Sequence, residues 1–131
     1  MADQTSTAKK PSAISISENV TLEELISDYR DIHMMLNAQW PIESDNERVF
    51  ARTMKLMEEL GELSNEILSK MGLQRQAKVD AFEQHHLEDE FADVLGSLLL
   101  LGIEMDIDVA EVMRRKIEFT LERLQQEFES Q

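Results

Sequence analysis

The sequence predicts an all-α fold, in which an antiparallel four-helix bundle-like protomer assembles into an oligomer. Only four glycines and two prolines occur in 131 residues, so few positions break a helix. Good helix formers (Leu, Met, Glu, Lys and Gln) dominate from Thr21 onward, and four segments carry apolar residues at helical spacing. Short connections between these segments favour an antiparallel bundle. A chain this short buries a modest share of its surface, so a subunit interface is expected to complete the core.

Three of the four helices are expected to begin with a polar residue followed three positions later by glutamate. In this pattern the two side chains satisfy free backbone N–H groups of the first turn. The pairs are Thr21 with Glu24, Ser44 with Glu47, and Asp108 with Glu111. The expected helices run from 21 to about 37, from 44 to about 71, from 82 or 86 to 105, and from 109 to about 128. Gly72 is placed to end the second helix in a left-handed conformation, and the apolar residues 91–103 predict that the third helix is the most buried.

Composition limits the partners and the location. The net charge of −14 argues against a polymeric nucleic acid, although an acidic chain can bind a small polyphosphate through divalent cations. The absence of cysteine excludes disulfides and thiol chemistry. The longest apolar run, residues 98–101, is far shorter than the roughly 20 residues of a membrane span, so no membrane partner is expected. Residues 1–19 are predicted to be a disordered tail without a secretory signal, and residues 20–131 a single cytoplasmic domain.

Two acidic pairs with the same spacing lie on consecutive predicted helices: Glu59 with Glu62, and Glu90 with Asp93. Residues three apart project to one side of a helix, and both pairs adjoin apolar positions that should turn inward. Four converging carboxylates repel one another unless a hard divalent cation neutralises them. Mg²⁺ prefers oxygen ligands, keeps substrate phosphates in its shell and polarises a phosphoryl oxygen. An ordinary solvated acidic face is the alternative interpretation, and the sequence leaves it open.

The run ELGE at residues 59–62, followed by EFAD at residues 90–93, resembles the ExxE…ExxD signature of the MazG-like nucleoside triphosphate pyrophosphohydrolases, which belong to the all-α NTP pyrophosphatase superfamily. The resemblance covers about residues 21–128. It implies hydrolysis of a (deoxy)nucleoside triphosphate between its α- and β-phosphates, giving a nucleoside monophosphate and pyrophosphate. It also implies Mg²⁺ as the cofactor, with Mn²⁺ as an alternative, and house-cleaning of the nucleotide pool as the role.

The same resemblance assigns roles to individual residues. Glu59, Glu62, Glu90 and Asp93 would be the metal ligands. Glu59 and Glu62 are the catalytic candidates, because one of this pair, with Glu59 favoured, would also orient or deprotonate the attacking water.

The substrate-binding candidates are spread along the chain. Lys116 matches a lysine that the family carries on its fourth helix, while Thr120 stands where the family often has asparagine. Arg123 is a candidate for a phosphate contact, and Lys55 is a further substrate-binding candidate. Trp40, the only tryptophan, lies where related dCTP pyrophosphatases place aromatic residues that stack on the base. The alternatives are solvated or ion-paired basic residues and, for Trp40, a core or interface position.

Two other functions stay open at this point. One is a phosphoribosyl-ATP pyrophosphohydrolase-like enzyme, and the other is a non-catalytic acidic helical dimerisation module. Family members pair tightly, so the resemblance implies a homodimer or a homotetramer built as a dimer of dimers. His33, His85 and His86 are expected to be exposed or interfacial, since hard Mg²⁺ does not favour imidazole.

Overall fold

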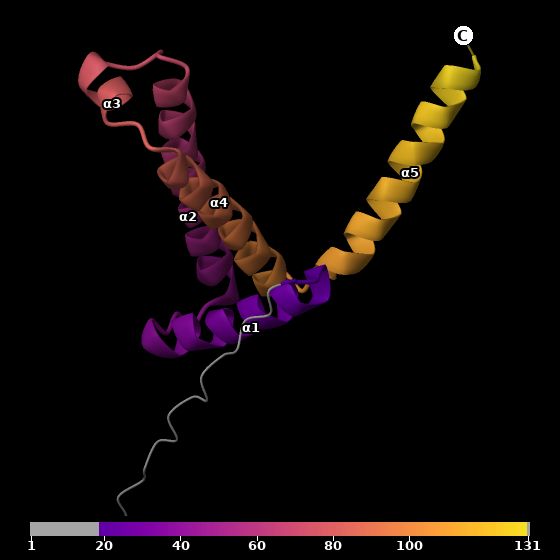
Figure 1. Cartoon of the computed structure of the whole chain (residues 1–131). Coiled ribbons are helices and arrows are strands. Elements are labelled where there is room, and N and C mark those ends of the chain that lie inside the picture. The colour runs from indigo at the N-terminus through magenta and orange to yellow at the C-terminus, as the bar shows by residue number, and fades with distance from the viewer. Residues whose placement is uncertain (1–18, 131) are drawn as a thin grey trace, which may run out of the picture.

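Two long helices, α2 (Asp45–Lys70) and α4 (Gln84–Glu104), lie side by side and run in opposite directions in the computed structural model, which describes residues 19–130 (Figure 1). Their contact is the most extensive between any two helices in this range. Polar contacts fix the register at both ends: Lys70 donates to Gln84 at 2.9 Å, and Arg48 Nε donates to Glu104 at 2.7 Å. This register places the middle of α2 opposite the middle of α4.

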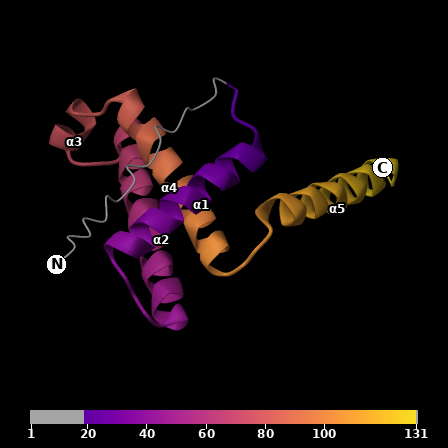
Figure 2. The same ribbon diagram turned by 90° about the horizontal axis from the view of Figure 1, so that it is seen from below.

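The two outer helices do not complete a bundle around this pair. Helix α1 (Leu22–Gln39) crosses α4, and α5 (Val109–Glu129) projects away from α2 and α4 (Figures 1 and 2). Among residues 19–130, α5 makes its only substantial helix contact with α1. The all-α prediction is confirmed, because the described chain contains helices and no strand. The predicted four-helix bundle is not confirmed for a single protomer.

Local sequence chemistry sets most helix boundaries as predicted. Thr21 forms the complete capping box, since its hydroxyl accepts from Glu24 N at 3.2 Å and the Glu24 carboxylate accepts from Thr21 N at 2.8 Å. Ser44 and Asp108 each accept one capping hydrogen bond, at 3.4 and 3.1 Å. Gly72 is left-handed, with φ 70°, directly after α2. The short helix α3 (Gln76–Asp80) was not predicted, and it begins without a side-chain cap.

The structure bears only in part on the predicted N-terminal tail and on the expected absence of a membrane span. The predicted disordered tail falls, for residues 1–18, outside the described residues. Within residues 19–130, none of the helices combines the length and the apolar character that crossing a membrane requires.

Burial is concentrated on α4, which confirms that this helix is the most buried. Four of its residues are buried, namely Gly96, Ser97, Leu99 and Gly102. Leu99, 3% exposed, is the only buried large apolar side chain in the described range. By contrast, α5 exposes a row of large apolar side chains: Met113, Ile117, Leu121, Leu124 and Phe128. Phe119 is also exposed, on the opposite side of the helix. One protomer therefore leaves much apolar surface in water.

Gly96 permits the close approach of α1 to α4, which gives a first testable prediction. A Cβ at this position would lie 2.7 Å from Cζ of Tyr29. We expect Gly96→Ala to lower the free energy of unfolding by about 1–3 kcal/mol, because the added methyl overpacks the helix contact. Gly61→Ala is the matched control: a Cβ there meets nothing within 4 Å, and removing a mid-helix glycine should raise stability by about 0.5–1 kcal/mol. Urea unfolding followed by circular dichroism measures both, and effects of the same sign would contradict this account.

Candidate functional site

The antiparallel register of α2 and α4 brings the two acidic pairs face to face halfway along the helices. One carboxylate oxygen each of Glu59, Glu90 and Asp93 lies within 4.8 Å of the other two. Glu59 is buried, with 6% exposure, Glu90 is half-buried and Asp93 is exposed. The cluster therefore opens to solvent on the Asp93 side and is closed on the Glu59 side.

Glu62, the fourth predicted ligand, lies beside this cluster and outside the group of three. Its side chain is exposed, but its carboxylate is close enough to raise the pKa of Glu90. The structure therefore brings three of the four predicted carboxylates to metal-bridging separations and places the fourth at the margin.

Glu90 is the residue whose environment is most unfavourable without a cation. Burial raises the pKa of its carboxyl group, and the negative charges of Glu62, Asp93 and Glu59 raise it further. Its Oε2 atom is buried and has no hydrogen-bond partner among the described residues. A buried acceptor without a donor costs free energy, and a cation bound by Glu90 would remove that cost. The donor set consists only of carboxylate oxygens, which suits Mg²⁺ or Mn²⁺.

Lys55 occupies the other side of Glu59. Its ammonium group is 2.6 Å from Glu59 Oε1 and 3.2 Å from Glu58 Oε2. The hydrogen bond to Glu59 is the main reason why the pKa of Lys55 is raised well above its ordinary value, so the side chain is fully charged. Lys55 is half exposed, which leaves it accessible to an anion that approaches the cluster.

Three of the predicted substrate-binding residues lie on α5, away from the carboxylates. Lys116 Nζ lies over the ring of Phe119 at 5.2 Å, the Thr120 hydroxyl donates to the Lys116 carbonyl at 2.8 Å, and Arg123 Nε is 3.7 Å from a Glu127 oxygen. Because α5 projects away from α2 and α4, one protomer does not bring these residues to the acidic cluster (Figure 1).

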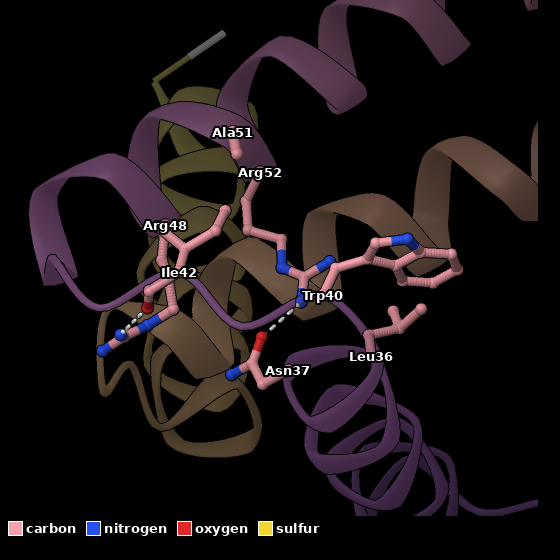
Figure 3. Close-up of a pocket in the computed structure, with 7 residues that line it drawn as sticks. All are labelled: Leu36, Asn37, Trp40, Ile42, Arg48, Ala51 and Arg52. Atoms are coloured by element: carbon pink, nitrogen blue, oxygen red, sulfur yellow. Dashed lines mark hydrogen bonds between the residues drawn. The ribbon is translucent and has the colours of Figure 1, made fainter.

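Trp40 lies at the end of α1 and is 63% exposed. It borders a cavity of about 80 Å³ together with Arg48 and Arg52 of α2 (Figure 3). Arg52 donates to Asn37 at 3.0 Å, and both residues line this cavity. Trp40 is therefore not a core plug, and its indole is available to a ligand or to a second subunit.

Tyr29 borders the acidic cluster but was not among the predicted site residues. Its ring packs against Gly96, one turn after Asp93. Burial raises the pKa of the Tyr29 phenol, and the charge of Asp93 raises it further, so the hydroxyl keeps its proton next to the cluster. A glycine one helical turn from an acidic motif was the only sequence signal for this contact.

Glu104, whose side chain is 5% exposed, lies at the centre of a buried polar network that was not predicted from the sequence. His33 Nε2 lies 2.7 Å from one of its oxygens, and Arg48 Nε donates to the other at 2.7 Å. Arg52 Nε is 3.9 Å away. His33 is therefore half-buried against Glu104 within one protomer, whereas His85 and His86 are exposed as expected.

Comparisons with known proteins identify no relative of this chain. No family model matches the chain, and neither curated proteins nor solved structures give a match. The functional assignment therefore depends on the residues and on their geometry.

Proposed function

We propose that this chain is a Mg²⁺-dependent nucleoside triphosphate pyrophosphohydrolase that cleaves between the α- and β-phosphates and acts on the cytoplasmic nucleotide pool. The observation that carries this proposal is the convergence of Glu59, Glu90 and Asp93, with a buried Glu90 oxygen that has no hydrogen-bond partner in the described chain. Such an arrangement is unfavourable in an apo protein and becomes favourable when a divalent cation binds.

The carboxylates and Lys55 would have different roles in the proposed reaction. Glu59, Glu90 and Asp93, with Glu62 at the margin, would hold Mg²⁺ or Mn²⁺, and the bound ion would polarise a phosphoryl oxygen and neutralise charge on the leaving pyrophosphate. Glu59 is the buried member, so its oxygens are shielded from bulk water and suited to orient the attacking water molecule. Lys55 supplies a full positive charge beside the cluster, where it can pair with a phosphate oxygen.

The dimerisation-module alternative explains less of the geometry. Exposed apolar surface fits self-association, but it gives no reason for carboxylates to cluster in the middle of the α2–α4 contact. A module selected only for association could place these acids in solvent, where they would not raise the pKa of Glu90. The metal-dependent enzyme accounts for both features.

A panel of canonical and modified nucleoside triphosphates, assayed for pyrophosphate release with and without Mg²⁺, tests the proposal directly. We expect Mg²⁺-dependent release of pyrophosphate and nucleoside monophosphate in equal amounts. Release of inorganic phosphate with a diphosphate product would place the cleaved bond between the β- and γ-phosphates and reject the proposed reaction. Absence of any Mg²⁺-dependent turnover across the panel would remove the enzyme proposal.

Glu90→Gln should stabilise the apo protein and abolish its response to Mg²⁺. Because the pKa of Glu90 is raised, this group stabilises the fold below pH 4.5, and that contribution is lost as the pH rises through the folded-state pKa. At pH 7 in EDTA the variant should therefore be more stable by about 1 kcal/mol, a rise of several degrees in Tm. Mg²⁺ should raise the Tm of the unsubstituted protein only.

Differential scanning fluorimetry measures both effects of Glu90→Gln. Glu88→Gln is the matched control, because Glu88 is exposed on the same helix and lies outside both groups of candidate metal ligands in the described chain. Its Tm in EDTA and its Mg²⁺ response should equal those of the unsubstituted protein. An equal Mg²⁺-induced rise in Tm for Glu90→Gln would contradict the metal site.

We further propose that the active form is a homo-oligomer, a dimer or a dimer of dimers. The described chain buries one large apolar side chain, Leu99, and leaves the apolar face of α5 largely exposed, although α5 contacts α1. Lys116, Thr120 and Arg123 lie along one edge of that face. Packing α5 on a second copy would bury the apolar row and offer these three residues to the substrate site of another subunit.

Leu121→Glu should convert the oligomer into a monomer, because it places a charge on the apolar face of α5. Leu121 is 54% exposed in one protomer, so in a monomeric protein the substitution would change stability by less than about 0.5 kcal/mol. Gln126→Glu is the matched control, since residue 126 projects to the side of α5 opposite the apolar row. Analytical ultracentrifugation measures the mass of each variant. A monomeric unsubstituted protein at micromolar concentration would contradict the proposed assembly.

A further inference from the structure

A second group of metal-ligating side chains lies at the start of α4, apart from the carboxylate cluster. One donor atom each of Glu83, His85 and His86 lies within 4.8 Å of the other two. His85 Nδ1 is 3.2 Å from Glu83 Oε2, and the ring centroids of His85 and His86 are 4.1 Å apart. All three residues are exposed, so a dissolved ion reaches them without any opening of the fold.

The backbone holds these three residues in a turn. The His86 N–H donates to the Glu83 carbonyl at 3.1 Å, which brings the two ends of the segment together. Lys70 donates to Gln84 at 2.9 Å and ties the same segment to the end of α2. The three side chains are therefore presented from an anchored turn, which lowers the entropy lost when they gather around an ion.

Glu83 is positioned in a way that helix capping does not explain. It occupies the N-cap position of α4, yet its carboxylate accepts no capping hydrogen bond from the helix and lies beside His85. Ser, Thr, Asp and Asn are the residues that ordinarily cap a helix start through a side-chain oxygen, and Glu83 does not take that role. Here the carboxylate and the two imidazoles form a common group of donors.

The chemistry of this group selects a different class of metal from the carboxylate cluster. Two imidazoles and one carboxylate suit a borderline divalent ion such as Zn²⁺ or Co²⁺, whereas Mg²⁺ prefers oxygen ligands only. Donor atoms around a tetrahedral zinc ion are roughly 3.3 Å apart, given bonds of about 2.0–2.1 Å, so small rotamer changes bring the three donors into place. Three protein ligands leave a further coordination position open to water.

We propose that Glu83, His85 and His86 form a binding site for a zinc-class divalent transition-metal ion, independent of the carboxylate cluster. His86 is one helical turn before Glu90, so the two sites share a side of α4. A bound ion places positive charge one turn from an acidic cluster, on a chain with a net charge of −14.

The test uses the full chain after treatment with EDTA. Isothermal titration calorimetry with Zn²⁺, in buffer containing excess Mg²⁺, is compared between the unsubstituted protein and the double variant His85→Ala/His86→Ala. We expect the double variant to lose one equivalent of bound Zn²⁺. The single substitutions His85→Ala and Glu83→Gln should each weaken binding by at least about tenfold, because each removes one of three ligands. Co²⁺ should give visible d–d absorption in the unsubstituted protein that the double variant lacks.

Two controls separate this site from the carboxylate cluster. Glu59→Gln should leave the additional Zn²⁺ equivalent and the Co²⁺ spectrum unchanged, and Glu88→Gln on the same helix should behave in the same way. Equal Zn²⁺ stoichiometry and affinity in the unsubstituted protein and in the double variant would overturn the proposal. Loss of the Co²⁺ signal in Glu59→Gln would also overturn it, because it would assign that signal to the carboxylates. Neither result depends on whether the protein hydrolyses nucleotides.

Discussion

Glu59→Gln is expected to lower kcat for pyrophosphate release by at least about 100-fold. The substitution keeps the shape of the side chain but removes its charge, and Glu59 is the buried member of the three converging carboxylates. Substitutions of groups that only support metal ligands commonly cost about 10- to 100-fold in affinity or activity, so loss of a charged ligand should cost at least the upper value. Steady-state assays across a range of Mg²⁺ concentrations would measure the effect.

Glu58→Gln provides the matched control for this experiment. Glu58 precedes Glu59 on α2 and also pairs with Lys55, at 3.2 Å, but its side chain is 57% exposed and lies outside the cluster. Both substitutions remove one charge from the same helix and one partner from the same lysine. We therefore expect Glu58→Gln to change kcat by less than about twofold, the size expected for a weak surface ion pair.

The two variants together distinguish a metal site from a general effect of charge. Higher Mg²⁺ should partly restore Glu59→Gln if the lost charge mainly weakens metal binding, and should not restore it if Glu59 also acts on the attacking water. Pyrophosphate release that survives Glu59→Gln undiminished would remove the proposed mechanism. Equal losses in both variants would attribute the effect to the net charge of α2.

The local features of this fold were predictable because their causes are local. The capping contacts of Thr21 and Ser44, and the left-handed Gly72, depend on residues within one helical turn. The same holds for the acidic pairs, since the three-residue spacing alone puts both members of a pair on one side of a helix. That Glu59 turns inward followed from its apolar neighbours.

The features that the sequence did not predict depend on residues far apart in the chain. Glu104 and His33 are 71 residues apart, and neither has a local pattern that indicates its partner. The direction of α5 depends on the turn before it, where Asp106 is left-handed with φ 53°, and among the described residues α5 packs mainly on α1 rather than on α2 or α4. The periodicity of α5 predicts an apolar face but does not say which copy of the chain covers it.

The direction of α5 also decides how the substrate-binding candidates are interpreted. In a closed bundle, Lys116 and Arg123 would face the carboxylates of their own chain. In the observed protomer they do not, and the proposed oligomer becomes part of the proposed active site. Leu121→Glu should therefore reduce pyrophosphate release as well as the mass of the assembly, although Leu121 is not one of the proposed site residues.

Glu104→Gln is expected to lower the free energy of unfolding by about 3 kcal/mol, the lower end of the range for breaking a buried ion pair. The side chain of Glu104 is 5% exposed and is held by His33 and Arg48, both at 2.7 Å. The effect falls at the lower end because Arg48 keeps its bonds to the Ile42 carbonyl, at 2.6 Å, and to Asp45. Glu111→Gln removes an exposed pair with Arg114 and should destabilise the fold far less, because solvent screens exposed ion pairs.

The pH dependence of the stability lost in Glu104→Gln tests whether that loss is electrostatic. Burial acts to raise the pKa of Glu104, but the hydrogen bonds and charges of Arg48 and His33 outweigh it, so the pKa lies below the ordinary value of 4.5. The unfolded chain therefore binds this proton more readily than the folded protein. The contribution of Glu104 is present above pH 4.5 and is lost as the pH falls through its folded-state pKa. Urea unfolding at several pH values should show the difference between Glu104→Gln and the unsubstituted protein shrinking on acidification, and a difference that stays constant would attribute the effect to packing.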